Sequence, residues 1–155
     1  MSGIKVAVQR PTEAGRLYPR YDRETDILVL ESPKIRDWVY GVDVDGRIVF
    51  DLDRQKVLAN CDLHVGMSRW ARDLEMEWPA GTRPGDIAFS EEAVAQKSFH
   101  LPLQVRSDRS ARYIRIAIGE TAPDELIALS GCCIALLAED ELVGFLVQGS
   151  PDDPS

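Results

Sequence analysis

The sequence predicts a mainly β protein in which two pseudo-symmetric antiparallel β-meander repeats pack as a sandwich or a partly open barrel, with one short helix between them. Three observations lead to this fold class: alternating apolar residues in the first half, a long apolar hairpin in the second half, and a weak internal similarity between the halves. We expect a single domain over residues 1–149, with repeats at about 17–65 and 102–149, a connecting segment at 66–101, and a disordered tail at 150–155.

An offset of about 85 residues relates the two halves of the chain. Residues 22–30 resemble 108–116, and residues 42–46 match 127–131 with glycine on glycine. Beyond these blocks, the same offset aligns Leu52 with Leu137 and Ala59 with Gly144. Matched blocks in the same order and at nearly constant spacing indicate a duplication, which then predicts the fold of both halves together.

The first repeat has the pattern of a half-buried hairpin. Trp38, Tyr40 and Val42 fall on one face and Asp37, Gly41 and Asp43 on the other, which is the period of a strand with one buried face. Asp45 and Gly46 then favour a tight turn. A three-residue loop over 44–46 keeps every large apolar group on one side, and it predicts the pairs Val42 with Ile48, Tyr40 with Phe50, and Trp38 with Leu52.

The second repeat is more apolar than the first. Residues 132–138 are apolar without alternation, which is typical of a strand covered on both faces, and residues 142–147 return after an acidic turn. At 122–129 two patterns compete. Thr121 and Asp124 have the spacing of a helix capping box, whereas the repeat requires a strand, and we favour the strand.

The connecting segment departs from the repeat. Residues 67–78 fit a strand and a helix equally well, and both alternatives remain open. Residues 79–85 have the proline and glycine content of a loop. Residues 90–97 begin with Ser90, a good N-cap, and carry acids in the first turn, so we expect a short helix that covers the apolar outer face of the second hairpin.

Two short motifs carry a family resemblance. Residues 21–28 read Tyr-Asp-Arg-Glu-Thr-Asp-Ile-Leu, and residues 51–53 read Asp-Leu-Asp. They resemble a family of short, uncharacterised prokaryotic proteins that opens with Tyr-Asp-x-x-x-Asp-x-Leu and closes with an Asp-x-Asp turn followed by Gly-x-Glu-Ile-Leu. The chain departs from that family at Ala59, in the place of glycine, and at Cys61, in the place of glutamate. The resemblance covers roughly residues 20–65, with a fainter second copy, and implies a duplicated β-meander unit without an established activity.

The charge and the cysteine content limit which partners and which cellular compartment we expect. A net charge of −8 disfavours duplex nucleic acid and anionic membranes as partners. No apolar run approaches the length of a membrane span, and the apolar stretch near the amino terminus is too short for a signal peptide. Three cysteines, an odd number, fit a reducing compartment, so we expect a cytoplasmic protein.

No metal or cofactor site is predicted. Cys61 and His64 are candidate metal ligands, with His100, Cys132 and Cys133 as further ones, but the paired ligands of structural zinc, such as Cys-x-x-Cys, are absent. Cys61 and His64 also fall on opposite faces of their strand, as do the adjacent Cys132 and Cys133. We expect the cysteines in the core. The aspartates of 43–46 and 51–53 lack the distant bidentate glutamate of a calcium loop, and we interpret them as turn residues.

The sequence also lacks a recognisable catalytic constellation. It has no Gly-x-Ser-x-Gly elbow and no nucleotide-binding glycine motif. Tyr21, Asp22 and Asp26 form a candidate acid–base group, but aspartates that flank a turn more often cap its backbone. These observations favour a non-enzymatic protein.

Our leading hypothesis is a module that binds another protein or a second copy of itself. The candidate partner-binding residues are Trp70, Trp78, Arg69 and Arg72, because tryptophan and arginine are enriched at interface hot spots. Burial of both tryptophans in the core or in a homodimer interface is the alternative reading. A second hypothesis is a small-molecule binder or small enzyme that uses a groove between the repeats. A third, based on the acidity alone, is a partner that masks a basic protein.

Overall fold

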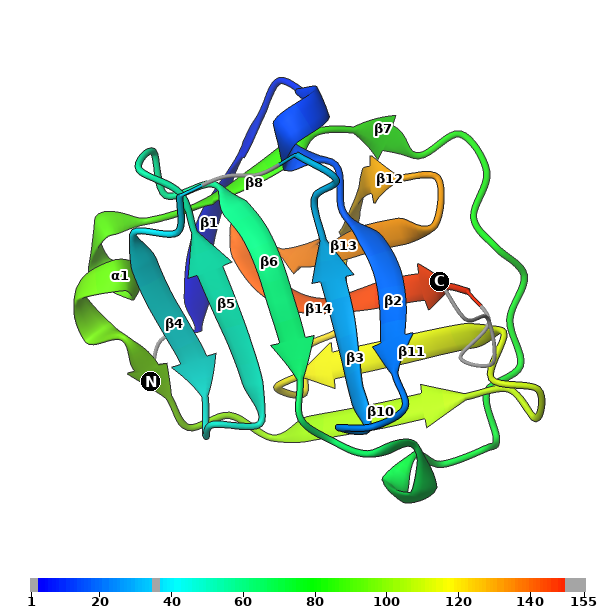
Figure 1. Cartoon of the computed structure of the whole chain (residues 1–155). Coiled ribbons are helices and arrows are strands. Elements are labelled where there is room, and N and C mark those ends of the chain that lie inside the picture. The colour runs from blue at the N-terminus through cyan, green and yellow to red at the C-terminus, as the bar shows by residue number, and fades with distance from the viewer. Residues whose placement is uncertain (1–2, 35–36, 150–155) are drawn as a thin grey trace.

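A computed structural model of the chain describes residues 3–34 and 37–149, and the predicted tail at 150–155 lies outside this described part. It contains a six-stranded and an eight-stranded sheet that are stacked face to face, and the strands of one run across those of the other in Figure 1. The mainly β fold predicted from the sequence is therefore confirmed. Among the described residues, no helix has the length and apolar character that a bilayer crossing requires.

The six-stranded sheet comes from the first half of the chain, apart from one short edge strand. Its spatial order is β2-β3-β6-β5-β4-β9. Its strands are β2 (Tyr18–Asp22), β3 (Ile27–Glu31), β4 (Tyr40–Val44), β5 (Ile48–Leu52), β6 (Leu58–Leu63) and β9 (Ser98–Phe99).

The eight-stranded sheet has the order β10-β11-β14-β13-β12-β7, and β1 joins it by pairing with both β14 and β8. Its strands are β1 (Ile4–Gln9), β7 (Arg83–Pro84), β8 (Asp86–Phe89), β10 (Leu103–Ser107), β11 (Tyr113–Ile118), β12 (Glu125–Ser130), β13 (Cys133–Ala138) and β14 (Glu141–Gln148). The strand expected at 122–129 is thus confirmed as β12, because pairing with β13 outweighs the local capping signal.

The two sheets share one connection pattern. In each, five consecutive strands lie in the spatial order first, second, fifth, fourth, third, and a two-residue strand pairs in parallel with the third. Each set of five strands is here called a unit, with β2–β6 as the first unit and β10–β14 as the second. In both units the fifth strand carries a bulge at the same place in its pairing with the fourth strand, at Ala59 in β6 and at Val143 in β14. This bulge makes Asn60 the structural counterpart of Gly144, whereas the sequence match placed Ala59 there.

The hairpin of β4 and β5 differs from its predicted register. Val44 pairs with Ile48, and Tyr40 rather than Trp38 lies opposite Leu52. The turn is tight because Asp45 and Gly46 both have positive φ and the Arg47 amide donates to the Val44 carbonyl at 2.9 Å. The shift of two residues keeps every side chain on its predicted face.

Trp38 was predicted to lie in the core, and this prediction is wrong. The indole is 58% exposed, because β4 begins only at Tyr40 and the shifted register leaves Trp38 beyond the end of the strand pair. Phe50 on β5, by contrast, is fully buried as predicted.

The main core fills the space between the two sheets. It takes its side chains from the inward-facing positions of both units, and it includes Cys133 and Cys61, of which Cys61 was predicted to point inward. Cys132, which was also expected in the core, is partly exposed. Phe50 and Phe145 meet there with ring centroids 6.2 Å apart.

The predicted short helix between the repeats is confirmed as α1 (Glu91–Gln96), capped by the Ser90 hydroxyl, which accepts from the Ala93 amide at 3.1 Å. Its predicted packing site is wrong. It lies against β4 and β1 rather than on the outer face of the β13–β14 hairpin. Residues 67–78 form neither a long helix nor a strand, because only Met67–Arg69 make one 3-10 turn before the chain becomes irregular.

Candidate binding surface

The candidate acid–base residues form hydrogen bonds that hold the turn between β2 and β3. The Tyr21 hydroxyl donates to Asp26, and the same Asp26 oxygen accepts from the Met67 amide at 3.1 Å. Asp22 accepts from the Glu24 amide at 3.0 Å, as an aspartate that caps a turn does. These carboxylates are thus used to hold the turn and to attach it to the chain that follows β6.

The residues that could suggest a metal are also dispersed or occupied. Cys61 is buried while His64 is exposed on the other side of the sheet, and the described residues contain no group of three side chains placed to hold an ion. His100 contacts Asp45 at 2.5 Å. Asp43 accepts from the Gly46 amide at 2.7 Å and from the Ser98 hydroxyl at 2.6 Å. The first bond holds the turn between β4 and β5, and the second joins β4 to the edge strand β9.

The four candidate partner-binding residues are placed differently from one another. Trp70 is only 4% exposed, and its indole N–H donates to the Val65 carbonyl at 2.8 Å, so it is a core residue and not a surface anchor. Arg69 is exposed. Arg72 is exposed and donates to the Arg109 carbonyl at 3.2 Å. Trp78 is half-buried and stacks on Tyr113, with centroids 6.0 Å apart.

Residues 71–82 form an extended segment, here called the strap, that covers part of the outer face of the eight-stranded sheet. Its side chains Met76 and Trp78 pack on a second apolar cluster contributed by β13 and β14. The strap starts with backbone hydrogen bonds to β10, in which the Ala71 amide donates to the Val105 carbonyl at 3.1 Å. It therefore takes the covering position that the sequence assigned to the helix.

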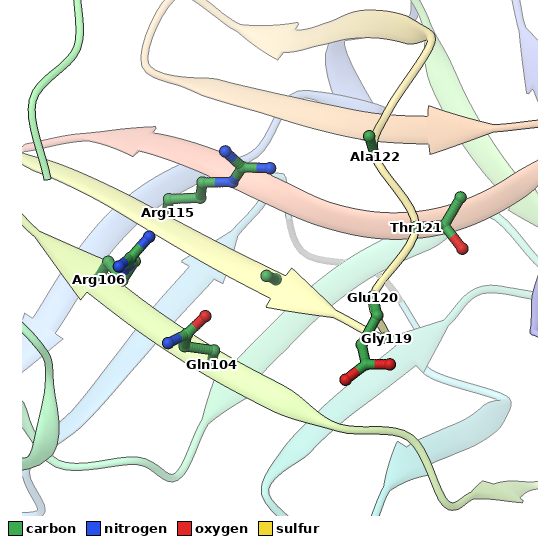
Figure 2. Close-up of a pocket in the computed structure, with 8 residues that line it drawn as sticks. Gln104, Arg106, Arg115, Gly119, Glu120, Thr121 and Ala122 are labelled. Atoms are coloured by element: carbon green, nitrogen blue, oxygen red, sulfur yellow. The ribbon is translucent and has the colours of Figure 1, made fainter.

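Beside the strap, the same outer face has an open groove of about 370 Å³. Figure 2 shows its floor, which β10 and β11 supply, and its wall, which is the loop after β11. The lining residues are Gln104, Arg106, Arg115, Ala117, Gly119, Glu120, Thr121 and Ala122.

Two arginines dominate the groove. Arg106 and Arg115 are paired directly across β10 and β11, so two like charges lie side by side on one face. Arg106 has an ion pair with Asp73 of the strap at 3.1 Å, in which both side chains are about half exposed. The side chain of Arg115 has no hydrogen bond or ion pair to any described residue, and its Nε is buried without a partner.

Among the described residues that line the groove, Glu120 alone carries a carboxylate. Figure 2 shows it at the opposite end from the two guanidinium groups, and none of the ion pairs among the described residues joins it to either arginine. A buried guanidinium nitrogen without an acceptor is energetically costly, because desolvation removes its water without supplying a replacement hydrogen bond.

The outer face of the six-stranded sheet is different, because its polar groups bind one another. Arg20 and Glu31 form an ion pair at 2.7 Å. The buried Asn60 donates to Asp51 at 3.0 Å and to Asp62 at 3.2 Å. Burial, and to a smaller extent the charge of Asp62, raises the pKa of Asp51. Arg20, Glu31, Asp51 and Asp62 therefore have hydrogen-bond or ion-pair partners within the protein, unlike the side chain of Arg115 on the other sheet.

The sequence hypotheses missed Arg106 and Arg115. A signal was present in the repeat, because Arg115 falls on Val29 when residues 108–116 are matched to 22–30. A charge at the counterpart of an apolar residue marks a place where the two matched segments differ. The groove itself depends on β10, β11 and the loop after β11, which no local pattern brings together.

No protein-family model matches the chain, and no curated protein sequence matches it. The resemblance of residues 21–28 and 51–53 to the family of short prokaryotic proteins thus stays a prediction from the motifs.

Proposed function

We propose that this protein is a non-enzymatic binding module whose binding surface is the outer face of the eight-stranded sheet, at the groove beside the strap. The observation that carries the proposal is the contrast between the two outer faces. The six-stranded sheet pairs its own charged groups, whereas the eight-stranded sheet leaves Arg115 unpaired in an open groove. Local conflicts of this kind are typical of functional sites.

Two further observations favour binding over catalysis. The space between the sheets, where a ligand site between the repeats was considered, is occupied by the apolar core. The acidic group of Tyr21, Asp22 and Asp26 is engaged in hydrogen bonds that hold a turn. Trp78 packs on the outer face of this sheet and Arg72 donates to the Arg109 carbonyl after β10, so both remain candidates for the periphery of the interface, together with the exposed Arg69.

We infer in addition that the two five-stranded units descend from one duplicated unit. The shared strand order and the shared bulge support this, because two unrelated meanders have no reason to place a bulge at the same position. Under this proposal the charged groups on the outer face of the first unit still pair with one another, whereas the outer face of the second unit has specialised for binding. The cytoplasmic location stays a prediction from the cysteine content.

A steric block tests the proposed surface whatever the chemistry of the ligand. Ala122 is exposed at the groove wall, and Ala122→Trp places a large ring over the opening. A matched control is Arg54→Trp, which adds the same ring to an exposed turn of the other sheet. Wild type and both variants serve as immobilised baits in extract of the source organism, followed by quantitative mass spectrometry.

We expect a set of molecules that wild type and Arg54→Trp retain and that Ala122→Trp loses. If all three baits retain the same set, the groove is not the binding surface. Sedimentation velocity of the same three proteins separates a second copy of the chain from a different partner, because self-association changes the sedimentation coefficient of the free protein.

A further inference from the structure

The strand registers allow the groove to be compared with its counterpart in the first half of the chain. Arg20 pairs with Val29 across β2 and β3, just as Arg106 pairs with Arg115 across β10 and β11. Since the strands occupy the same places in both units, Arg20 is the counterpart of Arg106, and Val29 is the counterpart of Arg115.

The carboxylates that neighbour these positions in the first unit are absent from the second unit. Glu31, which holds Arg20 at 2.7 Å, lies opposite Tyr18, and the residue at its place in the second unit is Ala117, opposite Gln104. Asp62 lies opposite Val29 on the next strand, and its counterpart opposite Arg115 is Leu146.

The charge balance of the two equivalent patches is therefore inverted. In the first unit, one arginine is accompanied by two carboxylates. In the second unit, both carboxylates are replaced by apolar residues and a second arginine is added. Among the described residues, Asp73 of the strap forms an ion pair with Arg106 and none does so with Arg115. Directly opposed like charges destabilise an antiparallel pair. The pair of Arg106 and Arg115 therefore lowers the stability of the free protein, unless a negatively charged group binds beside them.

We propose that the groove binds an oxyanion, a phosphate or carboxylate group of the ligand, between the guanidinium groups of Arg106 and Arg115. Arginine presents a planar array of donors that matches such oxygens and is the usual choice for them. Gln104 and the Thr121 hydroxyl line the same groove and supply additional donors for an oxygen. The anion replaces the partner that Glu31 provides internally in the first unit. This inference rests on the proposed function, since it names the chemistry that the same surface recognises.

The first unit suggests two substitutions that are compatible with the fold. Arg115→Val installs the residue of the equivalent position and removes one guanidinium. Ala117→Glu installs the equivalent carboxylate, which should pair with Arg106 as Glu31 pairs with Arg20 and so occupy the groove from within. Arg54→Gln is the control, because it removes one positive charge from an exposed turn of the other sheet.

The experiment titrates isotope-labelled protein with inorganic phosphate and, in a second arm, with succinate, against sodium chloride at equal ionic strength. We expect saturable changes in the backbone amide signals of 104–106 and 115–121 for at least one of the two anions. Arg115→Val should weaken that binding by about tenfold or more, as the loss of a hydrogen bond to a charged group implies. Ala117→Glu should weaken it similarly, and Arg54→Gln should leave it unchanged.

The preference between the arms identifies the group: saturation by phosphate alone indicates a phosphate ligand, and saturation by succinate alone indicates a carboxylate. Changes that do not saturate with either anion, or that persist in Arg115→Val, overturn the inference. Thermal unfolding gives a second readout, because Arg115→Val relieves the like-charge pair and should unfold at a higher temperature than wild type without anion. This result separates a loss of binding from a loss of structure.

Failure of this inference is distinguishable from failure of the proposed function. If Ala122→Trp abolishes capture of the partner but Arg115→Val does not, the surface binds a ligand without using an oxyanion. If neither substitution affects capture, the surface itself is not the site.

Discussion

Phe50 on β5 and Phe145 on β14 meet between the two sheets with ring centroids 6.2 Å apart. Each lies beside a small residue of the neighbouring strand, Phe50 beside Cys61 and Phe145 beside Ala135. The two units thus supply their large ring from different strands, the fourth in one and the fifth in the other. Because each small residue leaves room beside the ring of its own sheet, the centre of the core is filled without strict symmetry.

Replacing Phe145 with alanine should lower the free energy of unfolding by about 3–5 kcal/mol, because the cavity lies at the centre of the core, where both sheets restrict relaxation. Urea unfolding followed by circular dichroism measures this. The control is Trp38→Ala, which should change stability by less than about 0.5 kcal/mol, since the indole is mostly in solvent. An equal loss in both variants would contradict the placement of Trp38 outside the core.

Gly144 should not tolerate a side chain. Its φ is 152°, and a Cβ built there would lie 2.1 Å from the carbonyl oxygen of Ile116 on β11. Gly144→Ala should therefore cost about 2–4 kcal/mol of stability, since backbone strain and displacement of a central strand add together. Gly41→Ala, where a Cβ meets nothing within 4 Å, should be close to neutral. Matched thermal unfolding curves of the two variants distinguish these outcomes.

Stability should fall in alkaline solution in a way that depends on Tyr21. Burial, followed by the hydrogen bond to Asp26, raises the pKa of Tyr21 from 10.0 to about 12. Between these values the folded state retains a proton that the unfolded state has lost, so the free energy of unfolding decreases as pH rises through this range.

Tyr21→Phe should make that decrease shallower in urea titrations taken from pH 9 to pH 12, roughly the range that brackets the two pKa values. Tyr18→Phe, on the exposed side of the same strand, should leave the wild-type slope in place. A Tyr21→Phe slope identical to wild type would exclude Tyr21 as a source of the pH dependence.

The three cysteines should differ in reactivity. Burial raises the pKa of both Cys61 and Cys133, and the reactive thiolate is therefore suppressed at both, whereas Cys132 is partly exposed. A chromogenic thiol reagent should modify one cysteine in the native protein and all three in denaturant. Cys132→Ser should remove the native reaction, and rapid modification of two or three thiols without denaturant would mean that the core opens easily.

Alternation in the first half of the sequence was sufficient to predict which residues face inward in β5 and β6. Phe50 and Cys61 are buried as expected, and β12 forms where the repeat rather than the capping pattern placed it. The N-cap at Ser90 likewise predicted α1. These features follow from local periodicity and local hydrogen bonding, which the chain carries in short stretches.

The register of the first hairpin and the binding surface were decided only by the tertiary structure. Registers that differ by two residues place the same side chains inward, so the pattern could not distinguish the predicted pair of Trp38 and Leu52 from the observed pair of Tyr40 and Leu52. The groove requires β10, β11 and the loop after β11 to meet. The local sequence pattern of β11 is sufficient to predict that Arg115 points outward, but only the tertiary structure determines whether a carboxylate lies beside it.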